Sequence, residues 1–258
     1  MVKWSDANAK IEALQTVESL KKYLEGKKVY SFDLLSGFSC PFAHDCLSKA
    51  VEDSEGKRTI KDGPHTKFRC FSASQEVQYN GVYNLRKHNF DTLRQSNNMD
   101  LLLMDSLPKD TGIVRIHVAG DFFNADYMRA WYNVAYMNPS ILFYGYTKSL
   151  RYWQFHINEY PELDNLVLTA SYGGSEDNLI GEYNLRSTKV VFSEFEAYKL
   201  GLEIDSDDSH AARPDLRNQN FALLIHGVQP KGSEAAKALV KLKGQGSYNR
   251  KEKVNVER

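Results

Sequence analysis

The feature that most constrains the fold is a regular alternation of short β-rich runs with helical patterns, which continues from residue 112 almost to the end of the chain. Such alternation is typical of βα units arranged around a parallel sheet. One further β-rich run comes before it and brings the number of strands to six. We therefore predict an α/β fold, an open six-stranded parallel (β/α) partial barrel. The predicted strands are residues 29–35, 114–118, 141–144, 166–169, 189–192 and 221–225.

Helical patterns fill the intervals between these strands. Apolar residues recur at three- and four-residue steps over residues 7–24, where Ser5 and Asp6 can supply the cap. A second helical pattern begins just after Cys70, is interrupted near Asn80, and is followed by a further helical turn or two over residues 99–107. The other predicted helices are residues 126–137, 149–160, 176–183, 194–200 and 234–242.

The composition is that of an ordinary globular chain. The 258 residues carry 33 Lys and Arg against 33 Asp and Glu, so no overall charge attracts nucleic acid or an anionic membrane. No run approaches the roughly 20 apolar residues that span a bilayer, and the first residues lack the apolar run of a signal peptide. We expect one α/β domain over residues 1–245, a polar tail over 246–258, and a cytoplasmic location in which thiols stay reduced.

All three cysteines lie in one loop-rich segment that follows the first predicted strand. They are Cys40, Cys46 and Cys70. Cysteines used as small buried hydrophobes would be spread over helices and strands. A disulfide would leave one cysteine over, and nothing indicates an oxidising compartment. The pattern therefore favours a soft metal centre held by three thiolates.

The spacing of the cysteines bears on the choice between zinc and an iron–sulfur cluster. Structural zinc sites favour pairs of cysteines about two to four residues apart, whereas Cys40 and Cys46 enclose five residues and Cys46 and Cys70 enclose twenty-three. Zinc would also need a fourth ligand, for which His44 or His65 is available. A [4Fe-4S] cluster can be reached from a long loop, and three cysteines would leave one iron open. We favour the cluster and keep zinc as the alternative.

Small or ionisable polar residues follow nearly every predicted strand. In parallel α/β folds, ligands bind beyond the carboxyl ends of the strands. Several of these residues have simpler roles as helix caps or turn residues. Their convergence with the cysteines at one end of the sheet nevertheless predicts a ligand pocket. The candidates are Gly120, Asp121, Lys148, Ser171, Ser193 and His226.

Three cysteines at the mouth of an open six-stranded (β/α) barrel, a partial TIM barrel, resemble the radical S-adenosylmethionine superfamily. The resemblance implies that the open iron binds the methionine part of S-adenosylmethionine. It also implies that the Gly120-Asp121 turn lies near the cofactor's amine, and that Lys148, Ser171 and Ser193 contact its carboxylate and ribose. The superfamily's usual signature is CxxxCxxC, and this chain departs from it with CxxxxxC and a distant third cysteine.

A second resemblance covers nearly the whole chain. The phrases that carry it are SGFSCPFAHDC, DGPHTKFRCFSASQE, RIHVAGDFFNADYMRAW, ILFYGYTKS, LVLTASYGG and FALLIHGVQPKGS. With these phrases the sequence is similar to a phage-encoded family known as gene product 88, and the similarity implies a viral or mobile-element origin and hence a host cytoplasm.

Two functions follow as hypotheses. The first is a cluster-bearing barrel, an enzyme acting on a small molecule or nucleotide. The second is a non-catalytic binding module in which iron–sulfur or zinc staples the fold, and in which Arg86, Lys87 and Arg94 with nearby aromatic residues bind nucleic acid, or the surface binds a protein. The acidic run 203–210 is most simply a solvated loop, although His210 is a candidate fourth metal ligand. The chain contains no GxSxG, HExxH, P-loop or GxGxxG motif.

Overall fold

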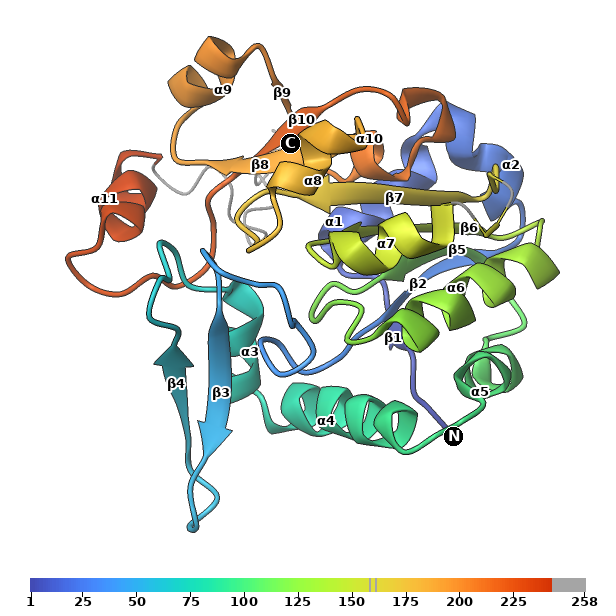
Figure 1. The fold of residues 1–258 in the computed structure, drawn as a ribbon, viewed down its shortest axis with the longest axis horizontal. Coiled ribbons are helices and arrows are strands. Elements are labelled where there is room, and N and C mark those ends of the chain that lie inside the picture. The colour runs from blue at the N-terminus through green and yellow to red at the C-terminus, as the bar shows by residue number, and fades with distance from the viewer. Residues whose placement is uncertain (158, 161, 243–258) are drawn as a thin grey trace, which may run out of the picture.

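The structure, a computed structural model, describes residues 1–157, 159–160 and 162–242. A mostly parallel eight-stranded sheet runs through the centre, helices cover both of its faces, and a two-stranded hairpin projects beside one end (Figure 1). The predicted tail over residues 246–258 lies outside the described residues, as does residue 158 of the helix predicted over 149–160.

The central sheet consists of β1 (Ser5–Asp6), β2 (Lys28–Phe32), β5 (Thr111–Ile116), β6 (Leu142–Thr147), β7 (Leu166–Ser171), β8 (Ser187–Val191), β9 (Glu203–Ile204) and β10 (Phe221–Leu224). The hairpin consists of β3 (Ser48–Glu52) and β4 (Arg58–Asp62). The α-helices are α1 (Ala9–Glu12), α2 (Lys21–Leu24), α3 (Phe71–Gln78), α4 (Asn80–Arg94), α5 (Met99–Ser106), α6 (Ala125–Met137), α7 (Leu150–Ile157), α8 (Asn178–Glu182), α9 (Glu194–Leu200), α10 (Ser209–Ala212) and α11 (Glu234–Lys241). Short 3₁₀ turns are η1 (Ala13–Thr16), η2 (Glu18–Leu20) and η3 (Pro214–Leu216).

All six predicted strands are present and pair in parallel, in the order β2-β5-β6-β7-β8-β10. The predicted number of strands is nevertheless wrong. The sheet has eight, because β1 pairs antiparallel with β2 at one edge and β9 pairs parallel with β10 at the other. Each added strand has two residues, too few for an alternating pattern to reveal it. The sheet order ends at β1 and β9, and no pairing of the described strands closes it into a barrel.

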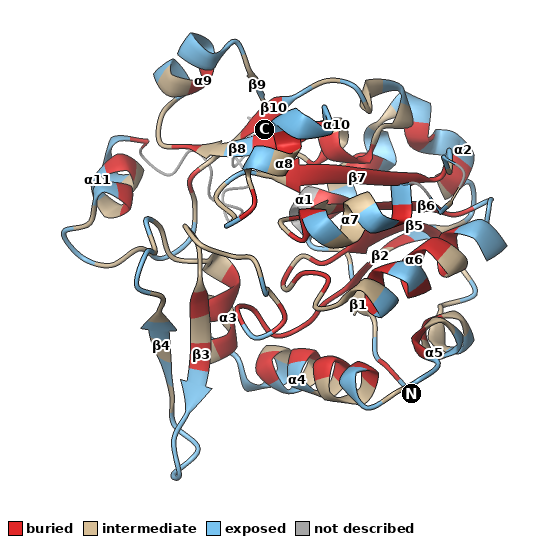
Figure 2. Ribbon diagram, viewed as in Figure 1, coloured by how far each residue is buried: buried red, intermediate tan, exposed pale blue. Residues whose placement is uncertain are grey.

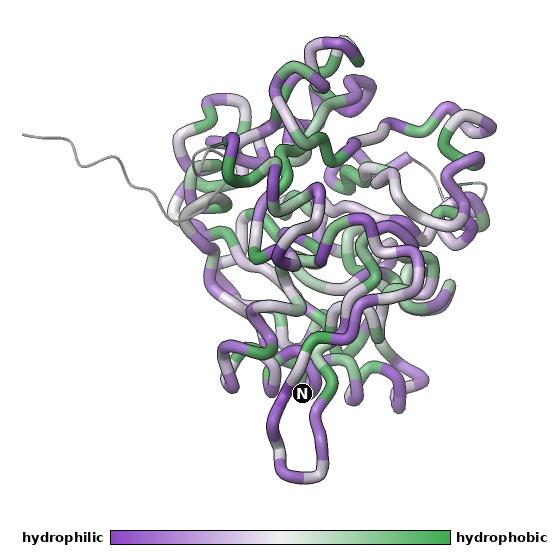
Figure 3. The backbone as a smooth tube through the Cα atoms, turned by 90° about the vertical axis from the view of Figure 1, so that its left-hand side faces the viewer, coloured by the Kyte–Doolittle hydropathy of each residue, from purple (hydrophilic) through white to green (hydrophobic). Residues whose placement is uncertain are grey.

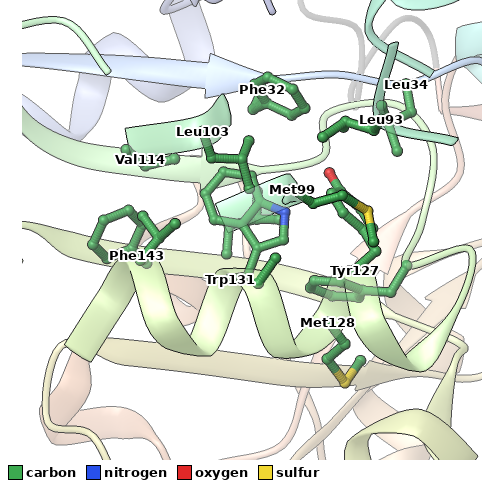
Figure 4. Packing of buried hydrophobic residues seen from close by; sticks show 14 of the residues in the cluster. Phe32, Leu34, Leu93, Met99, Leu103, Val114, Tyr127, Met128, Trp131 and Phe143 are labelled. Carbon is green, nitrogen blue, oxygen red and sulfur yellow. The ribbon is translucent and has the colours of Figure 1, made fainter. Parts of the chain in front are cut away.

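One face of the sheet packs against α4, α5 and α6 through a large apolar cluster. Every residue of β5 is buried, and Figure 2 shows the same for most of the central strands. Trp131 of α6 lies at the centre of this cluster, with its ring centroid 5.6 Å from that of Phe32 and 6.1 Å from that of Phe143 (Figure 4). These edge-to-face contacts join β2 and β6 to the helix layer.

The other face of the sheet packs against the N-terminal segment and α10. Ile11, Leu14 and Leu20 are fully buried against this face. The predicted continuous helix over residues 7–24 is wrong, because α1, η1, η2 and α2 follow one another there and Val17 between them is extended (φ −77°, ψ 115°). Ser5 and Asp6 pair with Ser31 and Tyr30 in β1 and do not cap a helix. The segment therefore buries its apolar residues against the sheet in short helical turns and not in the one continuous helix that its periodicity predicts.

The hairpin β3–β4 was not predicted, because the segment that carries the cysteines was read as loop-rich. Its strands pair in register from Ser48–Asp62 to Glu52–Arg58. Only Ser48 and Ala50 of its ten strand residues are buried, and Figure 3 shows hydrophilic residues along the projecting tip. With so little apolar burial, alternation gave no clear strand signal. No helix among the described residues is long and apolar enough to cross a membrane.

A candidate cofactor site at the carboxyl end of the sheet

A cavity of about 670 Å³ lies at the carboxyl ends of the parallel strands. It is lined by the ends of, or the residues after, β5, β6, β7, β8, β9 and β10, which is where parallel α/β folds bind ligands. The cysteine-bearing segment closes it from the other side. Its lining includes Cys40, Cys46, Cys70, Arg115, His117, Gly120, Asp121, Tyr146, Thr147, Lys148, Ser171, Asp205, Asp207 and His226.

The hairpin explains how three unevenly spaced cysteines reach one cavity. Cys46 comes just before β3 and Cys70 follows β4, so the antiparallel pairing returns the chain to its starting point. The base of the hairpin is held by Gly63, whose N–H donates to the Leu47 carbonyl (2.7 Å). The N–H groups of Lys67 and Phe68 donate to the Asp45 carbonyl at 2.8 and 3.1 Å. The long gap between the second and third cysteines is thus closed in space.

A buried carboxylate ties the first cysteine loop to the helix that follows the third cysteine. Glu76 of α3 is fully buried and accepts hydrogen bonds from Ser36 N (3.0 Å) and Ser36 Oγ (2.7 Å). The same carboxylate pairs with Arg86 Nη1 at 3.1 Å. Ser36 is four residues before Cys40, and α3 begins directly after Cys70. Glu76 therefore fixes two of the three thiols relative to each other.

Burial and the repulsion of nearby negative charges favour the protonated forms of Cys40 and Cys70. Burial raises the pKa of Cys40 well above its usual value, and the negative charges of Asp121, Cys70 and Cys46 raise it further. The pKa of Cys70 is raised to about 11, first by burial and then by Cys46. These interactions show that the three sulfurs lie within electrostatic range of one another. In the described part of the chain, however, no group of three or more His, Cys, Asp or Glu side chains is arranged to hold a metal ion.

The turn after β5 requires glycine at residue 120. Gly120 has φ +94°, a backbone conformation that side-chain-bearing residues rarely adopt. A Cβ atom there would lie 2.7 Å from both Leu34 Cβ and Ser39 Oγ. The turn therefore packs directly against the loop that leads to Cys40. Asp33 reinforces this contact, because its Oδ1 accepts from Val118 N at 2.7 Å.

Asp121 is a buried carboxylate held by three donors. It accepts hydrogen bonds from Thr147 Oγ1 (2.6 Å), Lys148 N (2.8 Å) and its neighbour Phe122 N (2.8 Å). Burial raises its pKa, and these hydrogen bonds oppose the rise. Lys148 in turn donates from Nζ to Ser171 Oγ at 2.6 Å. Four of the predicted residues, from Gly120 to Ser171, thus form one connected wall of the cavity across β5, β6 and β7.

Other predicted residues lie elsewhere. Ser193 is not among the lining residues, and its Oγ caps α9 by accepting from Glu196 N (3.1 Å). His210 is also outside the lining, with Nε2 placed 2.8 Å from Glu203 Oε2. The geometry therefore gives Ser193 no contact with a ligand in this cavity and brings His210 to a carboxylate instead of the cysteines.

The basic residues predicted to contact nucleic acid are engaged within the protein. Arg86 is 4% exposed and pairs with Glu76, so it is not part of a surface. Lys87 pairs with Asp91, and Arg94 lies 5.3 Å over the ring of Phe90.

Sequence reasoning missed a buried charged cluster beneath the cavity. Arg115 of β5 pairs with Asp208, a fully buried carboxylate that also accepts from Tyr144 Oη (3.1 Å) and Tyr146 Oη (3.5 Å). Part of the acidic run read as a solvated loop is therefore in the interior. The available signal was Arg115 itself, a charge inside the otherwise apolar run of residues 113–116.

The sequence matches the model of a family described as "Gene product 88" over residues 3–243, nearly the whole chain. No curated protein and no solved structure matches it.

Proposed function

The chain belongs to the gene product 88 family, and we propose that it is a phage-type iron–sulfur protein in which Cys40, Cys46 and Cys70 hold a [4Fe-4S] cluster. We further propose that the same cavity binds S-adenosylmethionine or a related nucleotide, as in a radical-S-adenosylmethionine-like enzyme. The observation that carries the proposal is the convergence of all three cysteines on one cavity at the carboxyl end of a parallel sheet.

The arrangement of the thiols favours a cluster over a single zinc ion. Around tetrahedral zinc, with Zn–S bonds of about 2.3 Å, neighbouring sulfurs would lie only about 3.8 Å apart. The thiolates around a cubane bind different iron atoms and stand farther apart. The two gaps between the cysteines, five and twenty-three residues, are longer than the about two to four residues typical of structural zinc sites and suit the wider spacing. The raised pKa values of Cys40 and Cys70 also fit a site whose thiolates need a bound cation.

The remaining wall of the cavity suits a zwitterionic nucleotide-like ligand. Lys148 and Ser171 offer a cation and a hydroxyl side by side to a ligand carboxylate. Asp121 has three internal donors, so its role is to hold the turn after β5 in place. The volume of about 670 Å³ falls within the range of about 300–1,000 Å³ of small-molecule sites. A bound reduced cluster would supply one electron; the chain itself binds, orients the ligand and excludes water.

Spectroscopy of anaerobically prepared variants tests the metal ligands. We expect the wild-type protein to show the broad visible absorption of an iron–sulfur cluster and the variant Cys46→Ser to lose most of it. Ser54→Ala, at the exposed tip of the hairpin, is the matched control and should keep the wild-type spectrum. A colourless wild-type protein that carries zinc would refute the cluster and leave the metal-stapled module.

A titration with S-adenosylmethionine separates the enzyme hypothesis from the binding-module hypothesis. Binding to the cluster-loaded protein, weakened in Lys148→Met but not in the exposed control Lys189→Met, supports the enzyme. A cluster-loaded protein that does not bind S-adenosylmethionine but is retained on single-stranded DNA at low salt supports the binding module.

A further inference from the structure

A turn formed by Gly173 and Gly174, the glycine turn, follows β7 and holds the segment between the first two cysteines. The N–H of Asp45 donates to the Gly173 carbonyl at 2.9 Å. Ala43 pairs with Gly174 in an isolated antiparallel bridge. Because Cys46 comes directly after Asp45, the position of this turn sets where the second thiol enters the cavity.

The glycine turn is in close contact with both the cysteine segment and the proposed ligand wall. Gly173 has φ +92°, and a Cβ atom there would lie 3.0 Å from Asp45 Cβ. A Cβ atom at Gly174 would lie 3.2 Å from Lys148 Cβ. Packing this close leaves little room for independent movement. The turn therefore joins the cysteine segment to the wall formed by Lys148 and Ser171.

Asp177 holds the glycine turn with both oxygens of its carboxylate. Oδ2 accepts from Gly173 N at 2.8 Å, and Oδ1 accepts from Gly174 N at 2.9 Å. Hydrogen bonds from N–H groups to an ionised carboxylate are among the strong ones in proteins. Asp177 stands at the N-terminal cap position of α8, where an aspartate commonly accepts from the helix, yet in the described part of the chain its side chain makes no such cap bond. The carboxylate is therefore committed to the turn and not to the helix that follows it.

We propose that Asp177 is a positioning residue of the cluster site, which holds the Cys46 thiol in place through the glycine turn. The inference rests on the proposed function, because it takes Cys46 as a cluster ligand. Glu76 already fixes Cys40 and Cys70 relative to each other, whereas the glycine turn fixes the cysteine that lies between them in the sequence. Asp177 is not among the described residues that line the cavity, so it does not touch a bound group itself.

Thiol crosslinking of the metal-free full chain with dibromobimane tests this positioning without a cluster. Mass spectrometry of the digested protein identifies which two cysteines each crosslink joins. We expect Asp177→Ala to slow the crosslinks of Cys46 about 10-fold, the effect of losing hydrogen bonds to a charged group, and to leave the crosslink between Cys40 and Cys70 unchanged. Asp177→Asn keeps one acceptor oxygen and should give an intermediate rate. Asn178→Ala changes the exposed neighbour of Asp177 and should crosslink like the wild type.

A second pair of variants perturbs the glycine turn and leaves the carboxylate in place. Gly173→Ala introduces a Cβ 3.0 Å from Asp45 Cβ and should slow the crosslinks of Cys46 as Asp177→Ala does. Gly232→Ala is the control, because residue 232 also has a positive φ (+84°) but its Cβ meets nothing within 4 Å. Gly232→Ala should leave all the crosslinks at their wild-type rates.

Iron release adds a readout on the loaded protein. A chelator should remove iron from anaerobically loaded Asp177→Asn about 10-fold faster than from the wild type, and equal rates would overturn the proposal. Crosslinks that follow the expectations above in a protein that binds neither iron nor sulfide would support the positioning of Cys46 and refute the cluster. A wild-type protein in which Cys46 forms no crosslink would overturn both.

The positioning role fails separately from the cluster. A wild-type protein that carries the cluster, together with undiminished Cys46 crosslinks in Asp177→Ala, Asp177→Asn and Gly173→Ala, would overturn the role of Asp177 and leave the cluster intact. If Asp177→Ala also loses the crosslink between Cys40 and Cys70, that variant has misfolded, and Asp177→Asn and Gly173→Ala decide by the same criterion.

Discussion

Replacing Arg86 with methionine should leave the fold with an unpaired buried carboxylate. Glu76 is fully buried and Arg86 is 4% exposed, so water cannot substitute for the lost partner. Removing one member of a buried ion pair costs about 3–5 kcal/mol, out of a total stability of about 5–15 kcal/mol for a domain. We expect Arg86→Met to lose about this amount near pH 7, as measured by urea denaturation.

The dependence of this loss on pH identifies its cause. Burial raises the pKa of Glu76 above its ordinary value, and Arg86 is the first opposing influence, so its removal raises that pKa further. A carboxyl group with a raised pKa in the folded state favours folding more as the pH falls toward the ordinary value near 4.5. The deficit of Arg86→Met should therefore shrink on acidification, by at most about 1.4 kcal/mol per pH unit.

Two further variants complete the test. The double variant Glu76→Gln/Arg86→Met removes both charges and should recover most of the lost stability, since neutral replacements of buried pairs are well tolerated. Arg94→Met changes an exposed arginine of the same helix and should cost less than about 1 kcal/mol. A deficit for Arg86→Met that is below about 1 kcal/mol, or that stays constant with pH, would refute the reasoning.

Three other changes test separate parts of the account. His117 lies 2.9 Å from Tyr127 Oη, and burial lowers its pKa to about 3. The stability that the neutral His117 contributes is therefore complete above about pH 6.5 and is lost as the pH falls toward 3. His117→Asn should reduce the pH dependence of the unfolding free energy over this acid range in urea titrations, and an unchanged slope would contradict the prediction. Gly120→Ala should lower the stability by at least about 1–3 kcal/mol, because residue 120 has a positive φ and the new Cβ would make contacts of 2.7 Å. Gly181→Ala in α8 is the control, because its Cβ meets nothing within 4 Å, and it should raise the stability by about 0.5–1 kcal/mol. Equal effects of the two changes on thermal unfolding would argue against the close packing of the turn after β5. Lys148→Met should weaken S-adenosylmethionine binding about 10- to 100-fold in the calorimeter, and an unchanged affinity would remove Lys148 from the ligand site.

The βα alternation predicted the sheet well because its strands are buried on both faces. The run at β5, for example, is apolar over residues 113–116 apart from Arg115, and its parallel pairing was predicted, although the predicted strand over 114–118 lies two to three residues later than Thr111–Ile116. Helix caps follow from local sequence: Ser193 and Ser233 each accept the backbone N–H three residues later, as capping serines do. Ser193 was nevertheless also a candidate contact of the cofactor. Features that depend on pairing between distant segments could not be predicted from the sequence. Ser5 and Asp6 look like a helix cap, yet they pair with β2.

The candidate site was predictable where chemistry lies next to strand ends, as for Gly120, Asp121, Lys148 and Ser171. The candidate site was not predictable where a side chain contacts a residue that is distant in the sequence. Arg86 reads as a surface charge on α4, and only its contact with Glu76, ten residues away on α3, shows that it supports the cysteine loop.

The most direct test of the central claim is the iron, sulfide and zinc content of the full chain purified without oxygen. If Cys40, Cys46 and Cys70 hold a [4Fe-4S] cluster, iron and acid-labile sulfide should be present in equal amounts, approach four of each per chain, and fall together in Cys46→Ser. Protein free of iron and sulfide, or protein that carries one zinc per chain, would contradict the claim.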